Sequence, residues 1–337
     1  RRPLSPLING QAWRVRSVQH RVLAGKDDGF WLISPQGANP IAAQTGYWAF
    51  EGLGTSDTLV AGTYTGVQYF RNTPSGLEYL GSFRGFKESS RYLETDGALI
   101  WVSHPYRGLF QLDTRTQSVK RYSAQHGLPN DLENYVFKIK NRIVIATLRG
   151  IYEYDIQNDR FVKAKRYITV FGDMPLRYLK EDRAGNIWFV KEKMLGVAAY
   201  SGDRPVLHFI PELNSKMLSG FEEIYAYDPE NVLISAQKGF YHIHYAKYLQ
   251  QTRPLEVYLK SVSAIGNADS TFWGGFGSPF VLKKIAYEFN SLRLAFASTN
   301  LDPEEYSYRL EGFDDEWQHW TPKNEKDYTN LPEGIYT

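Results

Sequence analysis

Apolar and polar positions in the first 250 residues repeat one short pattern. An apolar strand and a polar turn lead to a glycine, and a second strand, often rich in aromatic residues, follows that glycine. The marker glycines are Gly29, Gly66, Gly108, Gly150, Gly196 and Gly239, so successive periods are 37, 42, 42, 46 and 43 residues. A period in the low forties built only from strands is typical of a β-propeller with one four-stranded blade per repeat.

The fourth repeat shows the four strands of a blade. We expect them at residues 135–139, 143–146, 150–154 and 161–167. The second strands of several repeats, at residues 99–102, 186–190 and 232–235, are almost continuously apolar, as burial between two neighbouring blades requires. The pattern therefore predicts that Trp101 and Trp188, at equivalent places in these runs, are buried. Only residues 245–250 have a sequence suited to a short helix.

The repeat stops near residues 250–254, where the tail begins. Residues 257–262, 285–289, 292–296 and 306–310 are short strand candidates separated by turn residues, which is typical of a small β-sandwich. We therefore expect an all-β protein. A β-propeller over residues 1–250, with six visible blades of a seven-bladed ring, precedes an immunoglobulin- or fibronectin-like β-sandwich over residues 254–337 whose last strands are missing.

Composition removes several classes of function. The formal net charge is +2, and no basic block stands out, so we expect no nucleic-acid partner for this segment. The chain has no cysteine, so it has no disulfide framework and no thiolate metal site. No apolar run is long enough to span a membrane. We predict no cofactor, because no phosphate-binding loop, nucleophilic serine elbow or zinc-protease motif is present.

Several motifs resemble a known family. Residues 182–188 (Asp-Arg-Ala-Gly-Asn-Ile-Trp) and 126–130 (His-Gly-Leu-Pro-Asn) are similar to the two-component-regulator propeller repeat and to the phrase that joins its blades. Residues 306–317 and 328–336, which contain Tyr306, Tyr308 and Tyr336, resemble the triple-tyrosine domain that follows such propellers. Six repeats in register followed by this tail cover nearly the whole chain.

The resemblance implies the periplasmic sensor region of a Bacteroidetes-type hybrid two-component regulator, or of a related membrane-anchored transcription regulator. It implies an oligosaccharide ligand, a homodimer formed through the C-terminal sandwich, and an output kinase or DNA-binding module outside this chain. It also implies that any membrane span lies outside this chain, and that the segment is not itself an enzyme.

The candidate ligand site is the set of turns between the second and third strands, which we call the rim turns. These turns differ from blade to blade although the flanking strands are alike, an arrangement suited to recognition. Aromatic rings and arginines there suit sugar rings, uronates and sulfates. The candidates are Asp28, Tyr64, His104, Tyr106, Arg107, Arg149, Lys193 and Lys238. Each of these residues has a solvated turn as its simpler interpretation.

Two other functions stay open on the residues alone. A propeller glycosidase or polysaccharide lyase needs convergent carboxylates, for which Asp27–Asp28 is the only acidic pair in a plausible pocket; the pairs 304–305 and 314–315 fit turns of the sandwich better. A protein-interaction scaffold is the third possibility. His242 and His244 share a strand face, but no third ligand lies near in sequence, so we predict no metal site.

Overall fold

The computed structural model describes residues 10–200, 204–236, 239–251, 256–266, 270–274, 284–299 and 305–337. The chain divides into two compact units, Arg1–Tyr248 and Leu249–Thr337. Strands dominate both units, so the predicted all-β class is confirmed. None of the helices in the described ranges is long and apolar enough to cross a bilayer.

The first unit consists of six antiparallel sheets, one for each repeat. Blades 1 to 3 contain β1 (Ala12–Val18), β2 (Arg21–Lys26), β3 (Phe30–Ser34), β4 (Gly37–Ala42), β5 (Ala49–Gly52), β6 (Thr58–Thr63), β7 (Gly66–Thr73), β8 (Gly76–Ser82), β9 (Tyr92–Asp96), β10 (Leu99–His104), β11 (Gly108–Asp113) and β12 (Ser118–Tyr122). Blades 4 to 6 contain β13 (Tyr135–Ile139), β14 (Arg142–Thr147), β15 (Gly150–Asp155), β16 (Arg160–Lys163), β17 (Tyr178–Glu181), β18 (Ile187–Lys191), β19 (Met194–Ala199), β20 (Val206–Phe209), β21 (Ile224–Asp228), β22 (Asn231–Ala236) and β23 (Gly239–Ile243).

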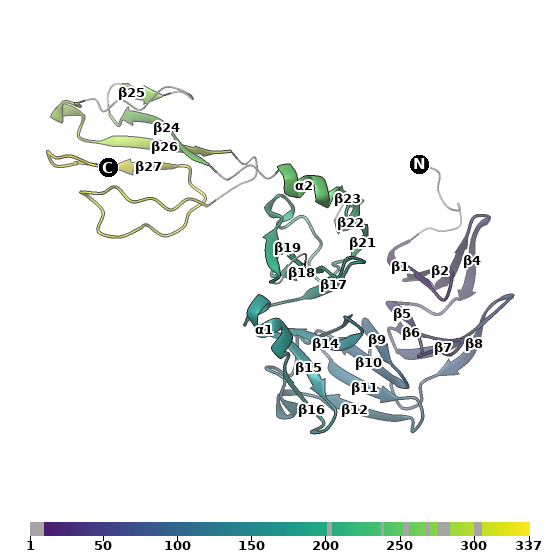
Figure 1. Ribbon diagram of the computed structural model, residues 1–337. Coiled ribbons are helices and arrows are strands. Elements are labelled where there is room, and N and C mark those ends of the chain that lie inside the picture. The colour runs from purple at the N-terminus through teal and green to yellow at the C-terminus, as the bar shows by residue number, and fades with distance from the viewer. Residues whose placement is uncertain are drawn as a thin grey trace. The chain divides into compact units, whose positions relative to one another are not determined.

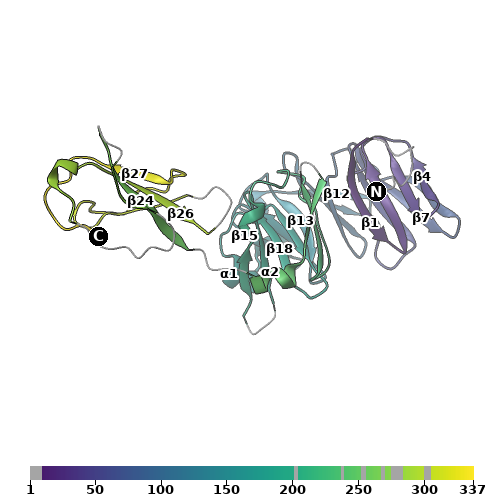
Figure 2. The same cartoon turned by 90° about the horizontal axis from the view of Figure 1, so that it is seen from above.

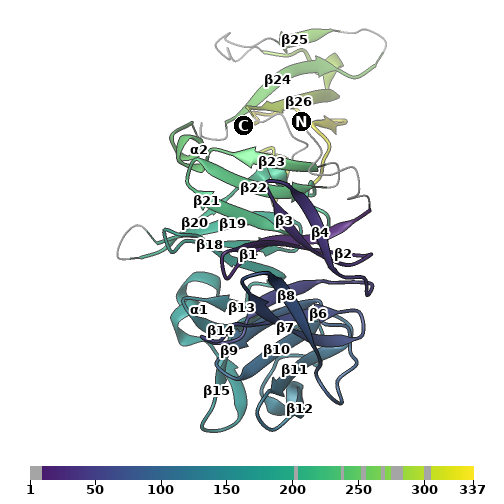
Figure 3. The same ribbon diagram turned by 90° about the vertical axis from the view of Figure 1, so that its right-hand side faces the viewer.

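The sheets follow one another around an arc in chain order (Figure 1). Within each sheet the strands are also in chain order, as β9, β10, β11 and β12 show from the centre outward (Figure 3). The first strand of every blade is therefore the innermost strand. This arrangement places β1, β5, β9, β13, β17 and β21 around a central channel.

Polar side chains close the hairpins as their sequences predict. The Asp182 carboxylate accepts the backbone N–H groups of Ala184 and Asn186 and the indole N–H of Trp188, at 2.9, 2.9 and 3.1 Å. Asp228 accepts the backbone N–H groups of its own turn in the same way. These side-chain caps hold the tight turns between first and second strands.

Five of the six marker glycines have a positive φ, which favours glycine. At Gly150, with φ +86°, an added Cβ would lie 2.2 Å from the carbonyl oxygen of Gly172. Gly196 is the exception. Its φ is ordinary, and the space for a Cβ is filled instead by the Phe189 ring. The same residue type therefore answers a conformational need in five blades and a packing need in the other.

The blade cores contain the predicted second-strand residues. Trp101 is 1% exposed and Trp188 is 0% exposed, so their predicted burial is confirmed. Trp101 packs edge-on against Tyr154 and Phe161 of the next blade, with ring centroids 5.0 and 5.7 Å apart. The tryptophans thus join neighbouring blades.

The outward faces of the first and last blades are less well covered. Val15 and Val22 in blade 1 are 54% and 41% exposed, and Tyr225 and Tyr227 in blade 6 are 52% and 45% exposed. These faces lie where the sequence analysis expects a further blade.

The helical segments correct one prediction. The fourth strand of blade 4 is shorter than the predicted 161–167, because β16 ends at Lys163 and helix α1 (Lys165–Phe171) follows. Tyr167 and Phe171 are buried on α1, so their apolar spacing reflects a helix that covers the blade edge. Helix α2 (Tyr245–Gln251) lies where a short helix was predicted. Short 3₁₀ turns occupy Ala124–His126, Pro211–Leu213 and Tyr287–Phe289.

The described residues of the second unit form a sheet in the order β25–β24–β26–β27, built from β24 (Val257–Ala264), β25 (Thr271–Gly274), β26 (Leu292–Ser298) and β27 (Glu325–Tyr328). Strands β24 and β26 lie side by side at its centre (Figure 2). Two predicted strands are wrong: residues 285–289 contain a 3₁₀ turn, and residues 306–310 form only a bridge from Tyr306 to Thr321.

The motif tyrosines of the second unit explain why residues 306–310 do not form the predicted strand. The rings of Tyr306 and Tyr308 stack on Phe296 of β26, with centroids 6.3 and 5.8 Å apart. The Tyr336 hydroxyl donates to the Pro332 carbonyl at 2.6 Å, as in a tyrosine corner. Side-chain packing, rather than strand pairing, therefore places this segment.

Candidate functional site

One position of each innermost strand lines the central channel. These residues are equivalent because they pair with Leu23, Val60, Trp101, Val144, Trp188 and Val232 at matching places in the second strands. The channel residues are Arg16, Glu51, Glu94, Phe137, Lys180 and Ala226. Together with other residues of the innermost strands, residues of the turns that follow these strands, and Glu223 before β21, they surround a volume of about 360 Å³, which we call the channel cavity.

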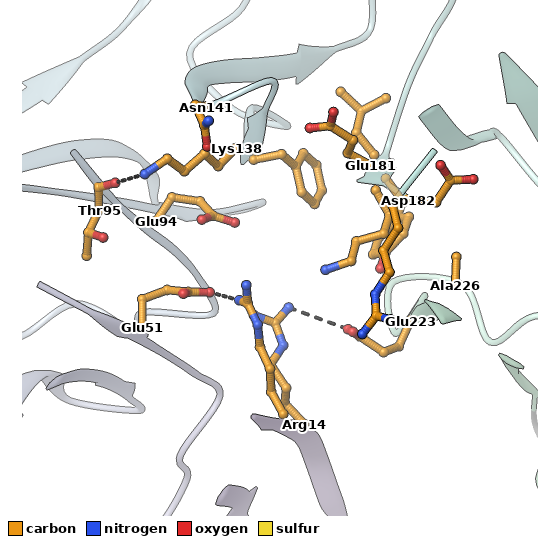
Figure 4. Close-up of a pocket in the computed structure, with 16 residues that line it drawn as sticks. Arg14, Glu51, Glu94, Thr95, Lys138, Asn141, Glu181, Asp182, Glu223 and Ala226 are labelled. Atoms are coloured by element: carbon orange, nitrogen blue, oxygen red, sulfur yellow. Dashed lines mark hydrogen bonds and ion pairs between the residues drawn. The ribbon is translucent and has the colours of Figure 1, made fainter. Parts of the chain in front are cut away.

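Several side chains that line the channel cavity form ion pairs with one another. Arg16 pairs with Glu51 of the next blade, and an Arg14 nitrogen lies 3.5 Å from a Glu223 oxygen of blade 6. In the close-up, Glu51, Glu94, Thr95 and Lys138 line one side and Glu181, Asp182, Glu223 and Ala226 the other (Figure 4). The Arg14–Glu223 contact links the first blade to the last.

Burial changes the protonation behaviour of this cavity. Desolvation raises the pKa of Glu94, although nearby Arg16 and Arg14 oppose the change. Desolvation lowers the pKa of Lys180, and the positive charge of Arg16 acts in the same direction. The pKa of the buried Tyr178 hydroxyl is raised well above its ordinary value, again chiefly by desolvation. The cavity is therefore a polar site whose charged groups are partly removed from water.

The opposite end of the channel, where the rim turns lie, is aromatic. The rings of Trp13 and Trp48 are 4.4 Å apart, and Phe221 from blade 6 lies 5.6 Å from Trp13. Tyr64 lies 5.1 Å from Trp48. The Arg91 guanidinium is 4.2 Å from the centre of the Phe221 ring and 5.0 Å from that of Trp48. We call these five residues the aromatic mouth.

The structure places the rim turns at the end of the channel that was predicted. In several blades the rim turn is hydrogen-bonded to the link between blades, as when the Glu133 N–H donates to the Pro105 carbonyl and the Ser90 N–H to the Thr63 carbonyl. The two kinds of loop therefore share one face of the propeller, beside the aromatic mouth.

Three rim candidates lie together in the turn of blade 3. The rings of His104 and Tyr106 are 5.9 Å apart, and the Arg107 Nε lies 3.9 Å from a Glu88 oxygen. Tyr106 is 73% exposed, so its ring is available to a ligand. Burial lowers the pKa of His104, and the neighbouring Arg91 and Arg107 lower it further.

The other rim candidates are dispersed. Tyr64 belongs to the aromatic mouth, whereas the Asp28 carboxylate forms an ion pair with the buried Lys26 ammonium, 2.8 Å away. Arg149 and Lys193 are exposed, and within the described ranges no hydrogen bond, ion pair or ring contact joins their side chains to another candidate. Lys238 lies outside the described residues.

Sequence reasoning missed most of the aromatic mouth. Trp13, Trp48 and Arg91 stand 16, 18 and 17 residues before the marker glycines Gly29, Gly66 and Gly108. They lie at or next to the start of the innermost strand, and this spacing of 16 to 18 residues is a signal that the sequence carries. Phe221 precedes β21 by three residues and stands 18 residues before the marker glycine Gly239, so it follows the same pattern.

The weaker candidates have structural partners. Asp314 accepts hydrogen bonds from the Leu310 N–H and the Tyr328 hydroxyl, at 2.8 and 2.7 Å, which is a capping role. His242 contacts Asn231, while His244 lies beyond β23 and accepts the Lys247 N–H. No cluster of metal-binding side chains is found within the described ranges.

Comparisons with known proteins support the family resemblance. Residues 304–337 match the model of the Y_Y_Y domain family, which confirms the resemblance seen in the tail. None of the curated proteins matches the chain.

Solved structures show the fold. One similar structure is the extracellular domain assigned to the hybrid two-component system BT3049 of B. thetaiotaomicron, with TM-score 0.66 and 15% identity, covering 95% of this chain and 46% of that chain. Another is the extracellular domain assigned to the one-component system BT4673 of the same organism, with TM-score 0.46 and 14% identity, over 97% of this chain and 52% of that one. The chain thus spans about half the length of these structures, and the first of them confirms the expected fold.

Proposed function

We propose that this chain is a periplasmic ligand-sensing module of a two-component or related membrane-anchored regulator. The observation that carries the proposal is the combination of a propeller with a Y_Y_Y domain match at residues 304–337, on a fold similar to the extracellular domain of a hybrid two-component system. Because that similarity shows the fold alone, the sensing role is argued from the site.

The ligand is an oligosaccharide bound at the rim turns and the aromatic mouth. The exposed Tyr106 ring offers a flat surface for the apolar face of a sugar. Arg107 is exposed beside it and is held only by the long contact to Glu88, so its guanidinium is able to take a carboxylate or sulfate in bidentate fashion. Arg91, fixed between two rings, adds a cation at the channel axis.

Signalling requires that the ligand favour one of two arrangements of the regulator. Both arrangements are those of a homodimer formed through the C-terminal sandwich, with the output module beyond this chain. A ligand shifts the balance between two arrangements only as far as its affinities for them differ. The proposal therefore demands tighter glycan binding by one dimer arrangement than by the other.

The test is calorimetry of the whole sensor region against a panel of neutral, uronate and sulfated oligosaccharides. Replacing Tyr106 and Arg107 by Ala should weaken binding by more than about thirtyfold, the effect of losing an anchor worth about 2 kcal/mol. Arg115→Ala is the matched control, because Arg115 is an exposed residue of the same blade in the turn between β11 and β12. Unchanged affinity in the double variant would remove the rim turns from the ligand site.

A further inference from the structure

The channel cavity contains two charged side chains that its ion pairs do not use. Glu94 projects from β9 and Lys180 from β17, and both line the cavity. Neither side chain forms a hydrogen bond or an ion pair with any residue that the structure describes, although each affects the pKa of the other. A carboxylate and an ammonium thus line the same cavity without partners among the described residues.

The neighbouring charges have local partners. Arg16 pairs with Glu51, and Arg14 lies beside Glu223. The Lys138 ammonium donates to the Thr95 carbonyl at 3.0 Å. The remaining lining charges are also engaged: Glu181 accepts the Lys140 N–H at 2.6 Å, Asp182 caps its own turn, and the Arg183 guanidinium lies 4.2 Å from the Tyr227 ring centre. The partnerless pair is therefore particular to Glu94 and Lys180.

A charged group that is partly removed from water and lacks a partner is unfavourable, and a ligand that supplies the missing partner relieves that cost. The volume of about 360 Å³ lies within the range of small-molecule sites. The cavity therefore has three features that a binding site requires: space, a cation without a partner and a hydrogen-bond acceptor without a partner.

We propose that the channel cavity binds a small hydroxy acid, whose carboxylate pairs with Lys180 and whose hydroxyl group bonds to Glu94. This site lies at the opposite end of the channel from the rim turns. It is independent of the oligosaccharide site proposed above, and either one can fail without the other.

The surroundings favour a hydroxyl over an ammonium at Glu94. Arg14 and Arg16 lie close enough to Glu94 to affect its pKa, so a ligand cation would face them as like charges. Desolvation raises the pKa of Glu94, and a hydroxyl is able to donate to the carboxylate or accept from the carboxyl group. A hydroxy acid therefore fits both protonation states of Glu94.

The experiment compares three ligands of equal chain length on the whole chain. D-Gluconate carries a carboxylate and hydroxyls, D-sorbitol lacks the carboxylate, and hexanoate lacks the hydroxyls. Titration calorimetry with ligand-observed NMR should show gluconate binding at least about tenfold tighter than either, a difference of about 1.4 kcal/mol. Equal binding of sorbitol or hexanoate, or no binding of gluconate at millimolar concentration, would overturn the proposal.

Variants assign the binding to the cavity. Lys180→Met and Glu94→Gln should each weaken gluconate at least about tenfold. Lys165→Met, at an exposed position of α1, is the matched control and should bind as the native chain does. Circular dichroism checks that each variant folds; if one does not, the other variant and the three-ligand comparison still decide.

Two further results are informative. Full gluconate affinity in a folded Lys180→Met or Glu94→Gln variant would overturn the site, and so would preferential binding of 6-aminohexanoate, which carries an ammonium in place of hydroxyls. Oligosaccharide binding at the rim turns, measured separately, should be unaffected by Lys180→Met. A loss of gluconate binding together with intact glycan binding therefore separates this site from the proposed sensor site.

Discussion

Replacing Trp188 by Ala tests the central packing of the propeller. Trp188 is 0% exposed, its ring lies 5.1 Å from that of Tyr245, and its indole N–H donates to Asp182. Deleting a buried aromatic ring typically costs about 3–5 kcal/mol, through lost transfer energy and the cavity that remains. The lost hydrogen bond adds about 1 kcal/mol at most, because Asp182 keeps its contact with Asn186, 3.0 Å away.

The assay is urea unfolding followed by circular dichroism. With a slope of about 3 kcal/mol/M, a loss of 3–5 kcal/mol moves the midpoint of the propeller transition down by roughly 1–1.7 M. Trp188→Phe should fall between Ala and the native residue, since it keeps most of the ring but loses the indole donor. The chain contains two units, so the sandwich transition is fitted separately.

The matched control is Trp320→Ala. Trp320 is 70% exposed, and its loss should change stability by less than about 0.5 kcal/mol. A Trp188→Ala chain that unfolds at the native midpoint would refute the reasoning, because it would mean that this ring does not fill the interior of its blade. A change in slope without a change in midpoint would point instead to a different unfolded state.

Three other predictions concern the turns, the acid limit and catalysis. Gly150→Ala should destabilise the propeller by more than about 1 kcal/mol, because a positive φ is combined with a backbone clash; Gly185→Ala, where φ is +82° and the Cβ space is open, should cost less in the same urea assay. Hydrogen bonds from Lys120 and two tyrosine hydroxyls lower the pKa of Asp159 to about 2, so its contribution is present above the unfolded pKa of about 3.9 and is lost as the pH falls through about 2. Asp159→Asn should therefore lower stability at pH 7 by no more than about 1 kcal/mol, given its half-exposed carboxylate, and by much less at pH 2, where the folded-state carboxylate is half protonated. We expect no release of reducing ends or unsaturated products from any glycan, because Asp28 is tied in an ion pair.

Each of these has an outcome that contradicts it. Equal stability losses at Gly150 and Gly185 would show that the backbone clash plays no part. A stability loss for Asp159→Asn that is as large at pH 2 as at pH 7 would mean that the ionised carboxylate is not the source. Glycan turnover that disappears in Asp28→Asn would make the propeller an enzyme.

The fold was more predictable than the site. The glycine period and the apolar second strands predicted the blades because both patterns arise from residues that are close in sequence. Trp188, within such an apolar strand, is an example. The segment after Lys163 was misassigned because Tyr167 and Phe171 are apolar at a spacing that short strands and helices share. Tyr306 was misassigned because its ring stacks on a strand ten residues earlier, a contact that no local pattern reports.

The candidate site was predicted only in outline. The rim turns lie at the expected end of the channel, but the Trp13–Phe221 contact joins the first blade to the last, and sequence proximity cannot reveal it. The same holds for the cavity, which Glu94 and Lys180 line from different blades. Neighbours of this kind depend on how the blades are arranged around the channel, which follows from the whole chain.

The channel receives one side chain per blade at each level, and this has a consequence for how such proteins diversify. Residues such as Arg16, Glu94 and Lys180 project from strands that are held in place by the buried residues at other positions. The channel lining is therefore a set of positions that can be substituted separately on a common scaffold. A single codon change replaces one side chain of the channel lining and leaves the scaffold unchanged. New ligand preferences can then arise through a succession of single substitutions, because each intermediate variant still folds. Duplicated copies of the gene can acquire different combinations of lining residues.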